Sequence, residues 1–100
     1  MNTTIQENDN QVVAVLEGRL DTGASLQAQK DLQPLLECKG REIVLDCTSL
    51  DYIASSGLRI FLNILQEARK NDCKVAIEGA NDYLREVFSM TGFTRLFEIR

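Results

Sequence analysis

Short apolar stretches alternate along this chain with longer segments in which apolar residues recur every three or four positions. Residues 11–17, 41–46 and 74–78 are rich in Val, Ile and Leu, a composition typical of strands. The run at 11–17 is so continuously apolar that we expect it to be covered on more than one side. Residues 3–7 and 96–99 are further candidate strands, at the first edge and at the end.

Three segments have the spacing of amphipathic helices: residues 24–37, 55–71 and 82–90. Asp21 or Thr22 is placed to cap the first of them, and Pro34 should kink it or start a fresh turn. The connections at 18–23 and 47–54 are expected to be loops. The residues expected to face the core are Leu26, Leu32, Leu35 and Leu36, then Leu58, Phe61, Leu62, Leu65 and Ala68, and finally Leu84, Val87 and Phe88.

This order of elements predicts one α/β domain spanning residues 1–100. We expect a mixed, mostly parallel sheet of about four to five strands, packed with about three to four helices. A chain of 100 residues, 44% hydrophobic and 26% charged, is long enough for one core and too short for two.

Charge and hydropathy narrow the range of partners. The net charge of −4 gives no basic patch for nucleic acid or for an anionic membrane. No apolar run approaches the roughly 18 residues of a membrane span. The first ten residues are polar and acidic, unlike a signal peptide. We therefore expect a cytoplasmic protein with neither nucleic-acid binding nor membrane insertion.

Residues that commonly carry catalysis or hold metals are sparse. The three cysteines, Cys38, Cys47 and Cys73, form no Cys-x-x-Cys pair, and the chain has no histidine. We expect three reduced thiols, with no zinc site and no disulfide. A serine nucleophile would lack its usual histidine base, and there is no glycine-rich phosphate loop of the Walker type. No enzymatic activity, cofactor or metal is expected.

The segment 52–62 combines two hydroxyls and a glycine with the start of a helical pattern. A serine suits a helix cap, and the free N–H groups and helix dipole at such an end favour negative charge. Gly57 has no side chain to cover the backbone of the first turn, so a phosphate on Ser55 or Ser56 would be tolerated there. The structural alternative is that Ser55-Ser56-Gly57 merely caps the helix.

Residues around this segment also allow two interpretations. Asp21 fits a helix cap, and Asp46 fits a strand end held by hydrogen bonds. Arg59 lies within one turn of Ser55, where it would touch a phosphate or simply be solvated. Ile60 and Ile64 widen the apolar arc of the helix; they form either an exposed shoulder for a partner or part of the core.

Several motifs resemble the STAS domain, the family of bacterial anti-sigma-factor antagonists, over nearly the whole chain. They are Glu17-Gly18-Arg19-Leu20-Asp21, Ile43-Val44-Leu45-Asp46, Ile53-Ala54-Ser55-Ser56-Gly57-Leu58 and Gly92-Phe93-Thr94-Arg95-Leu96-Phe97. Their order and spacing are more specific than any one of them alone.

The resemblance implies partner switching. In such systems an anti-sigma kinase phosphorylates the first serine of the motif, here Ser55, and a phosphatase resets it. The unmodified antagonist binds the anti-sigma factor and so releases sigma. The family's aspartate near this serine corresponds to Asp21. The implied partner surface comprises Asp21, Ser55, Ser56, Gly57, Arg59, Ile60 and Ile64.

One departure from the family pattern keeps a second function open. Ala54 stands where typical antagonists carry Asp immediately before the phosphorylated serine. Other STAS proteins act without phosphorylation, for example as accessory subunits of lipid-transport complexes. The alternative is therefore a non-phosphorylated STAS interaction subunit.

Overall fold

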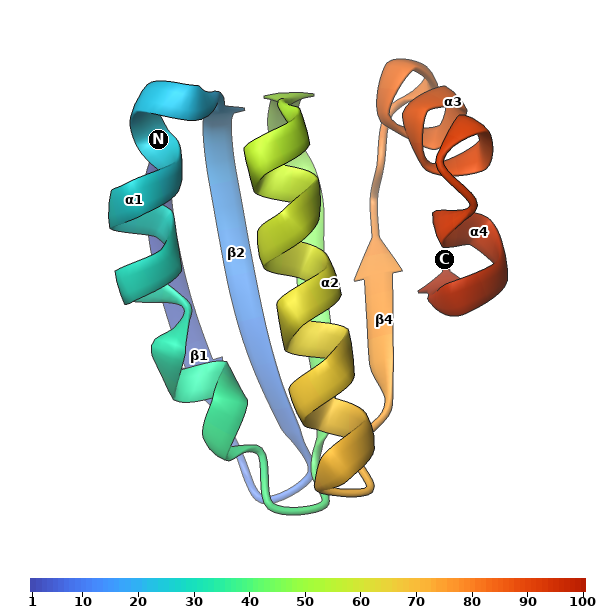
Figure 1. The fold of residues 1–100 in the computed structure, drawn as a ribbon. Helices are drawn as coiled ribbons and strands as arrows, with labels where there is room; N and C mark the ends of the chain where they lie inside the picture. Colours follow the sequence, from blue (N-terminus) through green and yellow to red (C-terminus); the bar gives the residue numbers. More distant parts are fainter.

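The computed structural model describes all 100 residues as a five-stranded sheet with helices packed on it (Figure 1). The strand order is β1-β2-β3-β4-β5; β1 is antiparallel to β2, and every other pairing is parallel. This confirms the predicted α/β class and the mostly parallel sheet. In chain order the elements are β1 (Asn2–Glu7), β2 (Gln11–Leu20), α1 (Thr22–Asp31), the 3-10 helix η1 (Gln33–Glu37), β3 (Glu42–Ile53), α2 (Ser55–Lys70), β4 (Val75–Glu78), α3 (Asp82–Met90), α4 (Phe93–Leu96) and β5 (Glu98–Ile99).

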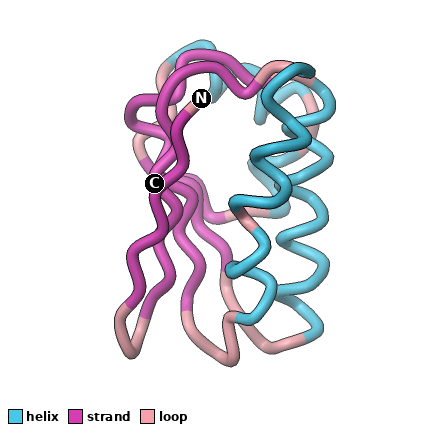
Figure 2. The backbone as a smooth tube through the Cα atoms, turned by 90° about the vertical axis from the view of Figure 1, so that its left-hand side faces the viewer, coloured by secondary structure: helices cyan, strands magenta, loops and turns pink.

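Helices α1 and α2 lie together on one side of the strands (Figure 2). In β2 the side chains alternate accordingly: Val12, Ala14 and Leu16 are fully buried, whereas Val13 and Val15 are only half-buried. The expectation that this strand is covered on more than one side was therefore wrong. β-branched residues on the open face give the strand its continuously apolar sequence.

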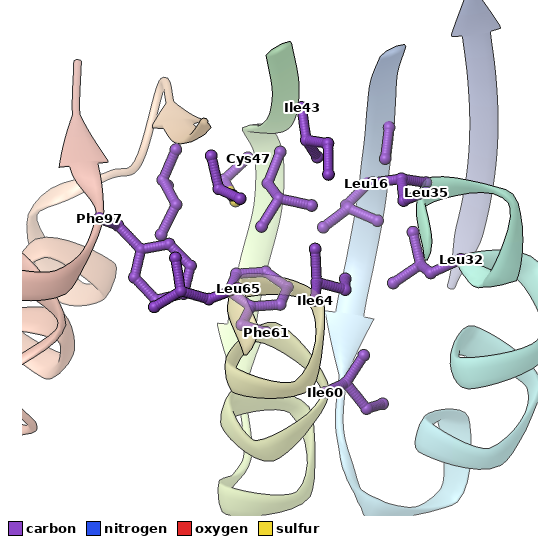
Figure 3. Close-up of a cluster of buried hydrophobic side chains, with 14 of the residues drawn as sticks. Leu16, Leu32, Leu35, Ile43, Cys47, Ile60, Phe61, Ile64, Leu65 and Phe97 are labelled. Atoms are coloured by element: carbon purple, nitrogen blue, oxygen red, sulfur yellow. The ribbon is translucent and has the colours of Figure 1, made fainter. Parts of the chain in front are cut away.

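The core is a single cluster of 26 buried side chains between the sheet and the helices. Phe61, Ile64 and Leu65 of α2 point towards the sheet, where Leu16 and Ile43 lie (Figure 3). A chain of aromatic rings joins Phe61, Phe88, Phe93 and Phe97, with centroid separations of 6.3, 5.8 and 5.1 Å. One continuous core thus connects α2 to α3 and α4.

Strands β2 and β3 extend further than the sequence pattern indicated. Residues 18–20 and 47–53, expected in loops, remain paired: Glu17 with Ser49 and Leu20 with Ile53. The pairing is irregular around Gly18, whose φ of 100° suits a residue without a side chain. Leu50 and Ile53 are buried. The polar residues of this region occupy a continued strand, which brings the chain directly to α2.

The first helical segment divides at Pro34 as predicted, since α1 ends at Asp31 and η1 carries the proline in its first turn. Leu32 and Leu35 are buried, but Leu26 is 69% exposed, so its placement in the core was wrong. The inward position in α1 is taken by Ala28.

The buried stripe of α2 is rotated relative to the prediction. Phe61, Leu65 and Ala68 are buried as expected, whereas Leu58 and Leu62 are half-buried. The additional buried residues of the helix are Gly57, Ile60 and Ile64. The rotation follows from the neighbours, because α2 packs against α1 and η1 as well as against the sheet.

The C-terminal segment differs from the expected strand at residues 96–99. Gly92, with a φ of 83°, turns the chain into the short helix α4, which buries Phe93. Strand β5 is confined to Glu98–Ile99, where it pairs with β4.

Cys38 and Cys73 form a disulfide, which corrects the expectation of three reduced thiols. The register explains how residues 35 positions apart meet. Ile43 of β3 pairs with Val75 of the parallel neighbour β4, so the segments leading into both strands lie at the same edge of the sheet. Cys47 is free and buried, and burial raises the pKa of its thiol to about 12.

Candidate functional site

The N-terminus of α2 lies where β2 and β3 end. The Ala54 N–H donates to the carbonyl oxygen of Leu20 at 2.8 Å, which ties the start of α2 to the end of β2. Ala54 is the N-cap, with extended φ and ψ of −90° and 170°, and no side chain caps the helix. The expectation of a serine cap was wrong, because Ser55 is already the first helical residue. The free N–H groups of the first turn remain an electropositive end.

The two serines of the motif have different surroundings. The Ser56 hydroxyl is half-buried and lies 2.6 Å from Ser25 Oγ of α1. Ser25 Oγ already donates to the carbonyl oxygen of Asp21 at 2.8 Å, so the proton between the two hydroxyls belongs to Ser56. Ser55 is exposed and its hydroxyl makes no intramolecular hydrogen bond. Of the two hydroxyls, that of Ser55 is the more accessible from solvent.

Gly57 allows the first turn of α2 to lie against the strand ends. A Cβ at this position would lie 2.7 Å from Leu20 Cγ and 2.9 Å from Ile53 Cγ1. Both neighbours are buried, at 0% and 3% exposure. The glycine therefore sets how closely α2 approaches β2 and β3, and with it the position of Ser55.

Asp21 is a helix cap, as its sequence context predicted. Its Oδ1 accepts a hydrogen bond from the Ala24 N–H at 2.9 Å, at the start of α1. Because Leu20 bonds to Ala54, this half-buried carboxylate stands at the junction next to the start of α2. Asp46 makes hydrogen bonds as expected, since its Oδ1 accepts from the N–H and hydroxyl of Thr48, but it lies within β3 and not at a strand end.

Arg59, Ile60 and Ile64 differ in their availability to a partner. Arg59 is exposed and lines a surface groove between α1 and α2 together with Ser25 and Ser56. Ile60 and Ile64 are only 6% and 2% exposed and point into the core (Figure 3). The structure contradicts the exposed-shoulder interpretation of these isoleucines, because the packing of α1 and η1 against α2 covers them.

Two further groups near this site had no recognisable sequence signal. Ser25 lies within the predicted helix at 24–37, and nothing in its local sequence indicates the contact with Ser56. The Arg19 guanidinium lies 4.3 Å from the centroid of the Tyr52 ring, and Tyr52 stacks on Tyr83 of α3 at 6.0 Å. Residues from β2, β3 and α3 make this stack, which depends on the tertiary arrangement alone.

The molecule shows neither a metal-binding cluster nor a membrane-spanning helix. Among the described residues, no group of three or more His, Cys, Asp and Glu side chains is arranged to hold a metal ion. None of the helices combines the length and the apolar character needed to cross a bilayer. The site thus consists of an exposed hydroxyl at a helix N-terminus, above a tightly packed first turn.

This fold is that of a known class of domain. The sequence matches the family model of the STAS domain over residues 2–100, and the chain belongs to that family. Two curated relatives are anti-sigma factor antagonists by name. BtrV of Bordetella bronchiseptica, provisionally named an anti-sigma factor antagonist, is 29% identical over 99% of this chain and 85% of the BtrV sequence. The anti-sigma-B factor antagonist of Bacillus subtilis is 22% identical over 99% of this chain and 90% of its own.

Solved structures support the same fold. A Thermotoga maritima protein, provisionally named an anti-sigma factor antagonist, superposes with a TM-score of 0.87 at 20% identity, covering 97% of this chain and 84% of the other. The antagonist SpoIIAA in its unphosphorylated form superposes with a TM-score of 0.77 at 18% identity, covering 99% of this chain and 87% of SpoIIAA. The phosphorylated form of SpoIIAA, from Bacillus, superposes with a TM-score of 0.75 at 19% identity, covering 99% of this chain and 91% of SpoIIAA.

Proposed function

We propose that this chain is an anti-sigma-factor antagonist that acts in the cytoplasm and is switched by phosphorylation of Ser55. In the unmodified state it binds an anti-sigma serine kinase, so that sigma factor is released. The kinase phosphorylates Ser55 and dissociates, and a phosphatase restores the hydroxyl. The chain itself is a binding partner and performs no catalysis.

The observation that carries this proposal is the exposed, unbonded hydroxyl of Ser55 in the first turn of α2. An acceptor serine must be reached by the kinase and must tolerate a dianion once modified. The exposed position meets the first condition, and the free N–H groups of the helix start favour the second. Ser56 is less suitable than Ser55 on both counts, because its hydroxyl is half-buried and hydrogen-bonded to Ser25.

The relatives add support of a different kind. SpoIIAA has been solved both with and without phosphate, and the two forms resemble this chain almost equally, with TM-scores of 0.75 and 0.77. A phosphate on an antagonist of this fold is therefore compatible with an intact scaffold. The proposed switch needs only a local change at the surface.

The magnitude of such a change is sufficient for a switch. A phosphoserine adds about −1.5 to −2 charges at neutral pH. If the partner covers Ser55, the phosphate must lose water against a surface shaped for a hydroxyl. An unpaired charge buried at an interface costs about 2–5 kcal/mol, which corresponds to about 30-fold to several-thousand-fold in affinity.

The proposed contact surface includes Ser55, Arg59 and Asp21, which are exposed or half-buried around the start of α2. Gly57, being buried, acts beneath that surface through the position of the first turn. Ile60 and Ile64 are excluded from it by their burial.

Paired variants test the proposal. The binding probe is an anti-sigma serine kinase, and a small histidine-kinase-like ATPase encoded in the neighbouring reading frame would be the first candidate to use. Ser55→Ala should bind it constitutively, and Ser55→Asp should bind at least about 30-fold more weakly. Ser56→Ala is the matched control and should still be phosphorylated on Ser55. Equal binding of Ser55→Ala and Ser55→Asp would refute the regulatory assignment.

A second candidate function rests on Ala54. The N-cap of α2 lacks the aspartate that typical antagonists carry before the acceptor serine. The alternative is a STAS interaction subunit that binds without phosphorylation, for example in a lipid-transport complex. The intact mass after incubation with ATP and the kinase separates the two functions: one added phosphate supports the switch, and an unchanged mass supports the alternative.

A further inference from the structure

The Cys38–Cys73 disulfide lies at the opposite end of α2 from Ser55. Cys38 follows the end of η1, and Cys73 lies three residues beyond the end of α2. Each cysteine adjoins a residue in the left-handed backbone region, Lys39 with a φ of 51° and Asp72 with a φ of 57°. These are the only non-glycine residues of the chain with positive φ, a conformation that costs energy for an L-residue. The disulfide therefore joins two unfavourable turns.

The two sulfur-bearing residues differ in access. Both are buried, with Cys38 0% and Cys73 7% exposed, but Cys73 forms part of the wall of a surface groove between the end of α2 and strands β4 and β5, which is open to a small molecule and not to a protein surface. A small thiol approaching from solvent therefore meets Cys73 first. Cys38, the C-cap residue of η1, has no exposed surface and does not line the groove.

The groove also carries cations that suit an anionic thiol. Arg69 and Lys74 line it, are exposed, and have no carboxylate within ion-pair distance. The acidic lining residues Glu42 and Glu98 are instead paired with Arg100, at 2.9 and 3.8 Å. Lys74 also acts on Glu42, whose pKa is lowered mainly by its hydrogen bonds to Arg100 and Gln11 and, to a smaller extent, by the charge of Lys74. Positive charge beside a disulfide attracts a thiolate and stabilises it during attack.

We propose that Cys38–Cys73 is a thiol–disulfide exchange site for a small anionic thiol of the glutathione type, which attacks at Cys73. The glutathione thiolate forms a bond to Cys73 Sγ while the Cys38–Cys73 bond breaks, and Cys38 leaves as a thiolate. A second glutathione thiolate then attacks the glutathione sulfur of this mixed disulfide and releases the Cys73 thiolate. The two cysteines gain two electrons and two protons, and two glutathione molecules become one glutathione disulfide; the reverse reaction restores the protein disulfide.

Cys47 takes no part in this exchange. It is buried, and burial raises the pKa of its thiol, so it supplies neither an accessible nor an ionised sulfur near neutral pH. The exchange thus converts the domain between two states that differ at one end only: one with η1 and the segment before β4 joined, and one with them released. Cys47 provides an internal control for reagent access to the core.

The first experiment uses the wild-type chain in buffers of graded reduced-to-oxidised glutathione ratio. Free thiols are trapped at neutral pH, without denaturant, by excess N-ethylmaleimide, and the intact mass is measured while circular dichroism follows the fold. We expect one transition, in which Cys38 and Cys73 become alkylated together while the domain stays folded and Cys47 stays unmodified. Reduction that occurs only at the rate of global unfolding would overturn the proposal and leave the disulfide a purely structural link.

Single-cysteine variants identify the attacked sulfur. With oxidised glutathione, Cys38→Ser should acquire one glutathione on Cys73, at least about tenfold faster than Cys73→Ser acquires one on Cys38. Equal rates, or a faster reaction at Cys38, would contradict attack through the groove.

Charge reversal tests the groove without removing a cysteine. Lys74→Glu should slow reduction by glutathione about two- to fivefold, and leave reduction by the uncharged dithiol dithiothreitol unchanged. Lys30→Glu, in α1 and outside the groove, is the matched control and should change neither rate. If Lys74→Glu slows both reagents equally, or neither, the groove is not the route and the assignment fails.

Discussion

Gly57 offers a sharp test of how α2 is seated on the sheet. A methyl group at this position would approach the side chains of Leu20 and Ile53 at 2.7–2.9 Å, closer than carbon atoms pack. Both neighbours are buried, so neither side chain can turn away into solvent. We predict that Gly57→Ala destabilises the domain, although the same substitution usually strengthens a helix.

Two opposing terms determine the size of the effect. Ala is favoured over Gly in a helix interior by about 1 kcal/mol. Overpacking a core by one methyl group costs about 1–3 kcal/mol, and three contacts below 3.0 Å to two side chains place this site at the upper end. The net loss is therefore about 1–2 kcal/mol. For a domain of this size, it lowers the midpoint of thermal unfolding by about 4–16 °C.

Urea unfolding of Gly57→Ala should show a lower midpoint with an unchanged slope. Gly23→Ala is the matched control, since Gly23 also lies in the first turn of a helix but its added Cβ would meet only Asp21 Oδ1, at 3.6 Å. That variant should be neutral or more stable by up to about 1 kcal/mol. If Gly57→Ala proves as stable as Gly23→Ala, the contact between α2 and the strand ends is looser than described.

Three further predictions concern the N-cap and the cysteines. Ala54→Asp should stabilise the unmodified domain by about 0.5–2 kcal/mol in urea unfolding. The new carboxylate would accept a hydrogen bond from an uncapped N–H and interact favourably with the positive end of the helix dipole, so a lower stability would contradict the cap geometry. Burial raises the pKa of the Cys47 thiol from 9.0 to about 12, so the unfolded state loses this proton at lower pH than the folded state. The free energy of unfolding should therefore fall as the pH rises above about 9, and Cys47→Ala should remove this pH dependence. Opening the Cys38–Cys73 link, which spans 35 residues, with dithiothreitol should cost about 4 kcal/mol in urea unfolding, and a loss below about 1 kcal/mol would show that the link adds little.

The elements that the sequence predicted well are those whose signal is local. Helix α3 was placed at residues 82–90, as observed, and α2 within one residue of its end. Their apolar residues recur at helical spacing, and this periodicity does not depend on the rest of the fold. The break at Pro34 was predictable for the same reason, because the missing N–H of proline acts within its own segment.

The features that were missed depend on which segments lie side by side. The sequence predicts a loop at residues 47–54, yet residues 47–53 belong to β3, which is held by pairing with β2. Leu26 and Ile60 both lie on apolar arcs, and only the packing of α1 against α2 leaves one exposed and the other buried. The disulfide depends on the register of β3 and β4. Which segments pack side by side cannot be predicted from the composition of each segment alone.

The candidate site shows the same division. The position of Ser55 at a helix start followed from the motif, but the difference between Ser55 and Ser56 did not. That difference arises from Ser25, which lies 31 residues earlier and binds one hydroxyl while leaving the other free. A motif with two adjacent serines cannot show which of them a neighbouring helix engages.

The seating of α2 also determines how a phosphate at Ser55 would act. Gly57 lets the first turn pack closely against the ends of β2 and β3, and Phe61 and Leu65 hold the next turns in the core. Moving the helix to accommodate the phosphate would break these contacts at a cost comparable to the large-to-small substitutions of a core, about 2–5 kcal/mol. Leaving an exposed phosphate in water at an electropositive helix end costs far less. The modification is therefore expected to change what a partner meets at the surface and to leave the domain beneath it unchanged.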